Sequence, residues 1–254
     1  MIERVALGRS GLVVSRLCFG TGTNGWNGRS NQGDLGVERL ARLLRHAHER
    51  GVTFWDTADQ YGTHPHVAAA LSEVDRASVT VATKTVARTA AEATAAIERF
   101  RRELGTDYLD ILLLHCMTDA EWPQQLVGVM DALSRAKERG LVRAVGVSCH
   151  DFGALTASAT CDWVDVNLVR LNGTGASMCA SPERVVPLIR QMAEAGKGVY
   201  GMKALGGGGE LTADPAHAIA YTGGVEGVHA LVVGMMSEAQ IDQNAALVSA
   251  VPRP

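Results

Sequence analysis

The sequence predicts one (β/α)8 barrel, the TIM-barrel form of the α/β class, preceded by an amino-terminal β-hairpin. Apolar runs and helical patterns alternate strictly in eight strand–helix units. The apolar runs are continuous, as expected for parallel strands that are buried on both faces. Three of these runs end on polar side chains, and such barrels place their sites at the carboxyl ends of their strands. The 254 residues suit a single domain over residues 1–254.

The chain begins with a short hairpin pattern over residues 4–14, in which Gly8 and Gly11 flank a charged turn; we expect it to cap the floor of the barrel. Several of the expected helices stop at a glycine, as left-handed helix caps prefer. The expected strands cover residues 17–20, 52–56, 79–84, 109–115, 142–148, 163–169, 198–203 and 229–234. The expected helices cover residues 37–50, 65–73, 90–104, 123–139, 152–159, 182–195, 213–221 and 238–249.

A doubly wound sheet shares this alternation and is the alternative fold. A dinucleotide-binding fold of that kind places a GxGxxG motif after its first strand. Here the loop after the first expected strand reads GTGT over residues 20–23, which does not match. The number of units and the polar residues after the second, third and fourth strands favour the barrel.

Composition excludes several kinds of function. The net charge of −3 gives no electrostatic reason to expect nucleic-acid or anionic-membrane binding. The five cysteines are scattered and form no CxxC pair, so we expect reduced thiols, no metal site and a cytoplasmic location. The amino-terminal residues resemble no signal peptide, and no apolar run reaches the length of a membrane span.

Four residues near strand ends form a candidate catalytic group: Asp56, Tyr61, Lys84 and His115. An ammonium beside a tyrosine stabilises the tyrosinate, which would make the phenol proton easier to release. A carboxylate would hold the lysine charged, and a histidine could donate a hydrogen bond to a carbonyl oxygen. Each residue alone has an ordinary structural interpretation, but four on adjacent strand ends predict the general-acid half of a carbonyl reduction. The hydride must come from a cofactor.

These residues lie in segments that resemble the aldo-keto reductase family over nearly the whole chain. The segment WDTADQYG (residues 55–62) is similar to the family signature around its aspartate and tyrosine. ATK (82–84) and LLH (113–115) are similar to its lysine and histidine strands, and RVALGRSGLVVSRL (4–17) to its amino-terminal hairpin. GLVRAVGVS (140–148) resembles a further family segment.

The resemblance implies a (β/α)8 barrel that binds NADPH, with NADH as the alternative, and an NAD(P)H-dependent enzyme that reduces an aldehyde or ketone, or runs in reverse. Asp56, Tyr61, Lys84 and His115 become the catalytic tetrad, with Tyr61 as proton donor. GVYGMKALG (198–206) and GMMSEAQIDQN (234–244) resemble segments that hold the pyrophosphate and the adenosine phosphate. The implied cofactor-binding residues are Gly20, Thr21, Gly22, Asp56, Ser148, Asn167, Met202, Lys203, Leu205, Gly206, Gly234, Ser237, Gln240 and Asn244.

The chain departs from the family pattern at three places. Cys149 stands where an asparagine often follows the serine. A glutamine of the family aligns equally well with Asn167 or Leu168. Met236 stands where a basic residue commonly precedes the serine, and because Arg or Lys suits a 2′-phosphate best, this substitution bears on the choice between NADPH and NADH.

The family usually carries a longer carboxyl-terminal tail that closes the substrate pocket. We therefore expect a pocket that is open or completed by a partner, with Trp26 and Trp122 as candidate substrate walls and ordinary packing as their alternative. A barrel with epimerase-type chemistry and a nucleotide-sensing module resembling potassium-channel β subunits remain alternative functions. The expected partner is a small carbonyl or alcohol substrate, whose identity the loops do not disclose; the sequence also leaves the oligomeric state open.

Overall fold

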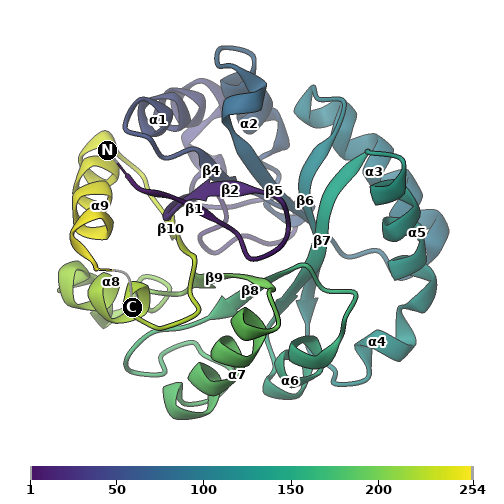
Figure 1. Ribbon diagram of the computed structural model, residues 1–254. Coiled ribbons are helices and arrows are strands. Elements are labelled where there is room, and N and C mark those ends of the chain that lie inside the picture. Colours follow the sequence, from purple (N-terminus) through teal and green to yellow (C-terminus); the bar gives the residue numbers. More distant parts are fainter. Residues whose placement is uncertain (1, 253–254) are drawn as a thin grey trace.

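The computed structural model describes residues 2–252, and its centre is a closed barrel of eight parallel strands surrounded by helices (Figure 1). The strands follow one another around the barrel in chain order, and β10 closes it against β3. This confirms the predicted (β/α)8 barrel. The strands are β3 (Leu17–Gly20), β4 (Phe54–Asp56), β5 (Thr80–Thr85), β6 (Leu109–Met117), β7 (Val142–Cys149), β8 (Val166–Arg170), β9 (Gly198–Met202) and β10 (Ala230–Gly234).

The helices form because amphipathic segments carry clear start and stop signals. Thr89 and Glu92 form a reciprocal capping box at the start of α3, and Gly105 ends that helix with a left-handed φ of 63°. The helices are α1 (Val37–Glu49), α2 (His64–Leu71), α3 (Ala90–Leu104), α4 (Trp122–Gln125), α5 (Val127–Glu138), α6 (Phe152–Thr160), α7 (Pro182–Glu194), α8 (Pro215–Gly223) and α9 (Glu238–Ala250). None of those described is long and apolar enough to cross a membrane.

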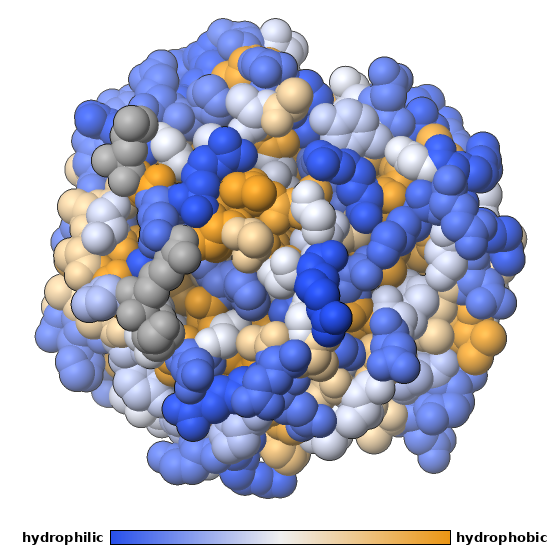
Figure 2. All heavy atoms as spheres, viewed as in Figure 1, coloured by the Kyte–Doolittle hydropathy of each residue, from blue (hydrophilic) through white to orange (hydrophobic). Residues whose placement is uncertain are grey.

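The expected hairpin consists of β1 (Arg4–Ala6) and β2 (Val13–Ser15), and it lies across the end of the barrel that faces the viewer in Figure 1. Leu7 and Leu12 at its turn pack with the residues inside the barrel, and the backbone N–H of Arg9 donates to the carbonyl of Gly196 at 2.7 Å. The surface at this end is mostly polar with small apolar areas (Figure 2). The hairpin therefore closes the barrel floor and leaves the opposite end for a site.

Side chains alternate between the barrel interior and the helix layer because a strand has a period of two. The interior is filled by residues such as Phe54, Ile111, Leu168 and Tyr200. Continuing the inward positions to the carboxyl ends gives Gly20, Asp56, Lys84, His115, Ser148, Arg170, Met202 and Gly234. The register of the barrel thus brings residues from all eight strands to one open end.

Most element boundaries lie within two residues of the expectation, and larger differences occur at two places. The helix expected over residues 123–139 is divided at Leu126, whose backbone leaves helical geometry (φ −110°, ψ 21°) while its side chain remains buried. The strand expected over residues 163–169 begins at Val166, because Trp163 and Val164 belong to the turn that enters it.

Candidate active site

The structure brings the four predicted catalytic residues together at the open end of the barrel. Lys84 on β5 donates from Nζ to Oδ1 of Asp56 at 2.6 Å, and the same Nζ lies 4.8 Å from the centre of the Tyr61 ring. The Tyr61 hydroxyl is 3.5 Å from Nε2 of His115 on β6. Tyr61 itself ends the short 3-10 helix η2 (Asp59–Tyr61), which follows β4.

A fifth side chain, Tyr200 on β9, donates the second side-chain hydrogen bond to the Asp56 carboxylate. Its hydroxyl donates to Oδ2 of Asp56 at 2.9 Å, so each carboxylate oxygen has its own donor. Lys84 is fully buried and also donates to the Thr57 carbonyl at 2.8 Å. Burial alone would lower the pKa of Lys84, but the neighbouring Asp56 and Tyr61 outweigh burial and raise it. Lys84 is therefore held as a buried ammonium.

Electrostatics divide the roles of Tyr61 and His115. Burial raises the pKa of Tyr61 above its ordinary value, although Lys84 acts in the opposite direction. The sequence predicts the effect of the ammonium alone, but burial affects the pKa of Tyr61 more strongly. Burial, assisted by Lys84 and His150, lowers the pKa of His115 to about 2. At neutral pH the site thus contains a protonated phenol and a neutral imidazole.

Two glycines shape the position of the Tyr61 ring. A Cβ atom at Gly22 would lie 2.2 Å from Cε2 of Tyr61, and one at Gly25 would lie 2.4 Å from Cδ1. Both positions must lack a side chain for the ring to occupy its place. The glycine-rich loop after β3 therefore leaves the space that the Tyr61 ring occupies.

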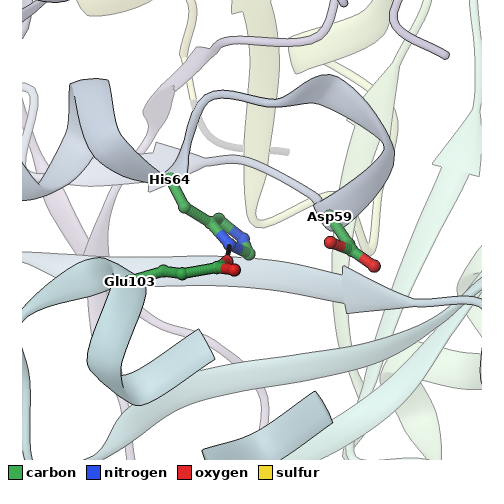
Figure 3. Close-up of side chains that lie close together, drawn as sticks. All are labelled: Asp59, His64 and Glu103. Atoms are coloured by element: carbon green, nitrogen blue, oxygen red, sulfur yellow. Dashed lines mark hydrogen bonds and ion pairs between the residues drawn. The ribbon is translucent and has the colours of Figure 1, made fainter. Parts of the chain in front are cut away.

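A network of ion pairs and hydrogen bonds fixes the turn that carries Tyr61, and Figure 3 shows three of its residues, Asp59, His64 and Glu103. Arg99 on α3 contacts Oδ1 and Oδ2 of Asp59 at 2.8 Å each and Oε1 of Glu103 at 3.0 Å. His64 donates from Nδ1 to the Glu103 carboxylate at 2.6 Å, so its Nε2 accepts from the Thr83 hydroxyl at 2.8 Å. Asp59, His64 and Glu103 are of metal-ligating types and lie close together. Their polar atoms already have partners in Arg99 and Thr83, so we interpret the group as a structural clamp.

A cavity of about 460 Å³ opens above the tetrad. Ten of the predicted site residues line it: Gly20, Gly22, Trp26, Asp56, Tyr61, His115, Met202, Lys203, Leu205 and Gly234. Lys84 lies beneath it. Trp26 is 47% exposed, and its ring centre is 5.6 Å from that of His115, which suits the expected substrate wall.

Two expected site residues, Trp122 and Asn167, direct their side chains away from the cavity, so the structure corrects both expectations. Trp122 is buried in the helix layer, where its indole N–H donates to the Ala154 carbonyl at 3.2 Å and its ring packs against Trp163. Asn167 is paired in register with Val147 and Val199 and shares their outward face. Leu168, the alternative alignment, points inward and lines the cavity.

Two further polar residues next to the cavity direct their side chains elsewhere. The Thr21 hydroxyl is fully buried, 3.0 Å from the Asp56 carbonyl and 2.8 Å from the Thr63 hydroxyl, so it joins β3 to the Tyr61 loop. The Ser148 hydroxyl accepts a hydrogen bond from the Cys116 N–H at 2.9 Å. Neither side chain lines the cavity.

The remaining expected cofactor residues lie beside the cavity or beyond it. Gly206 does not line the cavity, whereas the next residues, Gly207 and Gly208, do.

The expected residues of α9 are engaged within the helix. Ser237 caps α9 by accepting from the Gln240 N–H, and the Gln240 side chain accepts from the Met236 N–H at 2.7 Å. Asn244 is buried in the same helix. None of the α9 residues lines the cavity.

The polar residues of the cavity wall that the sequence did not predict include Cys116, His150 and Arg170. Nδ1 of His150 lies 2.7 Å from Nη2 of Arg170 and 3.0 Å from Sγ of Cys116. Arg170 could have been predicted from the alternation of side chains along a strand, because it follows the inward residues Val166 and Leu168 on β8. The same alternation, extended to the end of each expected strand, predicts that Arg170 faces the cavity.

Comparisons with known proteins agree with this geometry. The sequence profile of the Aldo/keto reductase family matches residues 16–214. The chain is 29% identical over 182 residues to versiconal hemiacetal acetate reductase of Aspergillus parasiticus, covering 58% of this chain and 51% of that protein. It is 28% identical over 158 residues to L-galactose dehydrogenase of Arabidopsis thaliana, covering 58% and 48%. The aligned part spans about half of the length of these relatives.

Solved structures are similar over nearly the whole chain. An aldo-keto reductase of Bacillus halodurans in its holo form has a TM-score of 0.80 at 21% identity, covering 100% of this chain and 93% of that one. An aldo/keto reductase of Klebsiella pneumoniae in complex with NADP and acetate has a TM-score of 0.76 at 21% identity, covering 99% and 92%. Since the family profile covers most of the sequence and the barrel carries the tetrad, the protein belongs to the aldo/keto reductase family.

Proposed function

We propose that the protein is an NAD(P)H-dependent oxidoreductase that reduces an aldehyde or ketone to an alcohol, or catalyses the reverse reaction, with Tyr61 as the proton donor. The observation that carries this proposal is the Asp56–Lys84–Tyr61–His115 arrangement at the base of one cavity. Family membership supports the reaction class.

The cavity residues suit an anionic dinucleotide. The lining extends from Tyr61 and His115 to Lys203, Gly207 and Gly208, and then to Gly234 at the end of β10. Among residues 2–252, Lys203 makes no ion pair with a carboxylate. Lys203 with the neighbouring glycines would hold the pyrophosphate, and the part of the cavity lined by Gly20, Gly22 and Tyr61 would receive the nicotinamide. When bound, the reduced nicotinamide supplies the hydride.

The protein residues would polarise and protonate the carbonyl group. Nδ1 of His115 is buried without a partner, and a buried unpaired N–H is less tolerable than a buried unpaired acceptor, so we assign the ring proton to Nε2. The Nε2–H and the Tyr61 hydroxyl then point into one space and can both donate to a carbonyl oxygen. Tyr61 releases its proton to the developing alkoxide while the Lys84 ammonium stabilises the phenolate that remains. Asp56 and Tyr200 keep Lys84 in position.

NADPH is the proposed cofactor and NADH the alternative. Met236 provides no charge for a 2′-phosphate, and the Ser237 and Gln240 side chains are already engaged in capping α9. The amino-terminal end of α9 still offers a weak anion site through its dipole. We therefore expect only a modest preference for NADPH over NADH.

The test is a fluorescence titration of the purified protein with NADPH and with NADH, followed by a turnover screen with aldehydes and ketones at saturating nucleotide. The proposal expects saturable binding of at least one nucleotide and consumption of that nucleotide with a carbonyl compound. Tight binding without turnover would favour a nucleotide-sensing role. Binding of neither nucleotide would contradict the proposed function.

A further inference from the structure

Arg170 is a cation of the cavity wall that has no carboxylate partner among residues 2–252. It is the last residue of β8, on the inward face with Leu168, and it lines the cavity above the tetrad. Its Nη2 lies 2.7 Å from Nδ1 of His150, whereas its Nε is buried and has no partner. Within residues 2–252, no carboxylate forms an ion pair with it.

Other partly buried arginines of the protein form ion pairs with carboxylates. Arg76 pairs with Asp110 at 2.6 Å, and Arg99 pairs with Asp59 and Glu103. Burying part of a guanidinium without an anion is costly, so an unpaired arginine facing a cavity is prepared to receive an anion from outside the chain.

His150 supplies a second donor at the same place. A guanidinium has only donors, so Nδ1 of His150 must accept from Arg170 and the ring proton must lie on Nε2. No protein acceptor among residues 2–252 engages this Nε2–H, and His150 lines the cavity. Arg170 and His150 thus present N–H groups together.

The charges of the cavity wall also favour the binding of an anion. Asp56 is the carboxylate of the lining, and both of its oxygens are engaged by Lys84 and Tyr200. Arg170 and Lys203 remain as uncompensated cations. Lys203 belongs to the loop that suits the cofactor pyrophosphate. Arg170 reaches instead toward His150, whose ring centre is 6.4 Å from that of His115.

We propose that Arg170, together with the Nε2–H of His150, binds a carboxylate of the substrate, so that the substrates are short carbonyl acids in which a carboxylate lies a few carbons from the reacting C=O. The single charge of a carboxylate matches the single guanidinium, and its two oxygens match the parallel donors of arginine. Arg170 and His150 then select the substrate, and the tetrad performs the chemistry. This inference rests on the proposed reductase function.

The first part of the test measures binding without turnover. Protein saturated with NADP⁺, or the protein alone if it does not bind NADP⁺, is titrated calorimetrically with benzoate and with benzamide, its neutral counterpart. The proposal expects benzoate to bind at least about tenfold more tightly, and expects Arg170→Gln to abolish this difference. Arg88→Gln is the matched control, because Arg88 is exposed, close enough to influence Cys116, and outside the cavity lining.

The second part measures kcat/KM for succinate semialdehyde, its neutral counterpart butanal, and phosphonoacetaldehyde. We expect succinate semialdehyde to be preferred over butanal by about 10- to 100-fold in the wild type and in Arg88→Gln. Arg170→Gln should lose most of that preference while its activity toward butanal and its affinity for NADPH change by less than about twofold. Arg170→Lys, which keeps the charge but loses the paired donors, should retain part of the preference.

The outcomes separate the two proposals. Turnover with equal preference for acid and neutral aldehydes, or benzoate binding that ignores Arg170→Gln, would overturn the carboxylate site and leave the reductase intact. Weakened NADPH binding in Arg170→Gln would show that Arg170 serves the cofactor, and a preference for phosphonoacetaldehyde would show that the site is built for phosphate; each overturns the proposal. Arg170-dependent benzoate binding without turnover of any aldehyde would support the site and contradict the reductase function.

Discussion

The hydroxyl of Tyr200 donates a hydrogen bond of 2.9 Å to Oδ2 of Asp56 inside the barrel, joining β9 to β4. The other oxygen of Asp56 accepts from Lys84. Because Tyr200 and Asp56 are 144 positions apart in the sequence, a long-range contact helps to position the ammonium beside Tyr61. The tetrad is therefore held from two sides of the barrel.

Tyr200→Phe should weaken both stability and catalysis. It leaves one oxygen of a buried carboxylate without its donor, and hydrogen bonds to charged groups contribute about 1.5–3 kcal/mol. We expect the free energy of unfolding in urea to fall by about that amount and kcat to fall with little change in KM. A variant with unchanged stability and kcat would show that Asp56 does not need this donor.

Gly22→Ala should displace the catalytic phenol. The new Cβ would lie 2.2 Å from Cε2 of Tyr61, so the ring must move. We expect kcat to fall by about 10- to 100-fold, since a displacement of about 1 Å can have effects of that size. Gly128→Ala is the control: its Cβ would meet only the Ala90 Cβ at 4.0 Å, within helix α5. Equal activities of the two variants would show that the Tyr61 ring does not need this space.

Arg99→Met should loosen the turn that carries Tyr61. The variant removes the bidentate contact to Asp59, at the start of η2, while keeping much of the side-chain volume. We expect kcat to decrease by roughly three- to tenfold with NADPH affinity preserved, because the loss concerns positioning. As a control, Arg101→Met removes the Glu98 ion pair on the same helix without touching η2. A similar loss of kcat in both variants would exclude a specific role for the Arg99 clamp.

Much of this arrangement follows from the sequence, because strands and their ends carry strong signals. Asp56, Lys84 and His115 terminate apolar runs, and parallel strands bring those ends to one edge. The sequence does not predict contacts between distant strands or the direction of single side chains. Tyr200 lies on a strand distant from Asp56 in sequence, and only closure of the barrel reveals the contact.

The sequence also does not predict the direction in which single side chains point. Asn167 and Leu168 differ by one position and face opposite sides of β8, so a shift of one residue exchanges a cavity wall for a core position. Trp122 reads as a loop aromatic, yet its indole is buried against Trp163. The Thr21 hydroxyl turns away from the cavity to a hydrogen bond of 2.8 Å with the Thr63 hydroxyl. Such choices depend on packing partners that a local pattern does not name.

The pH dependence of carbonyl reduction should be flat between about pH 5 and pH 9. His115 and His150 have pKa values lowered to about 2 and about 3, and both stay neutral above those values. Tyr61 and Lys84 have raised pKa values, so both remain protonated until the medium is strongly alkaline. A profile of kcat/KM with NADPH saturating would test this. A limb centred near the ordinary pKa of histidine would contradict the assignment of a neutral His115.

Tyr61 is the proposed source of the proton, and the Tyr61→Phe variant is the most direct test of this role. With the substrate identified by the turnover screen, single-turnover oxidation of bound NADPH should slow by about 10²- to 10⁴-fold, because a general acid contributes a factor of that order. The dissociation constant of NADPH should stay within about twofold. Tyr108→Phe, which removes a hydroxyl from a ring outside the cavity lining, should leave both quantities unchanged. We expect loss of the chemical step with intact NADPH binding; a Tyr61→Phe protein that reduces the carbonyl at the wild-type rate would show that Tyr61 is not the proton donor.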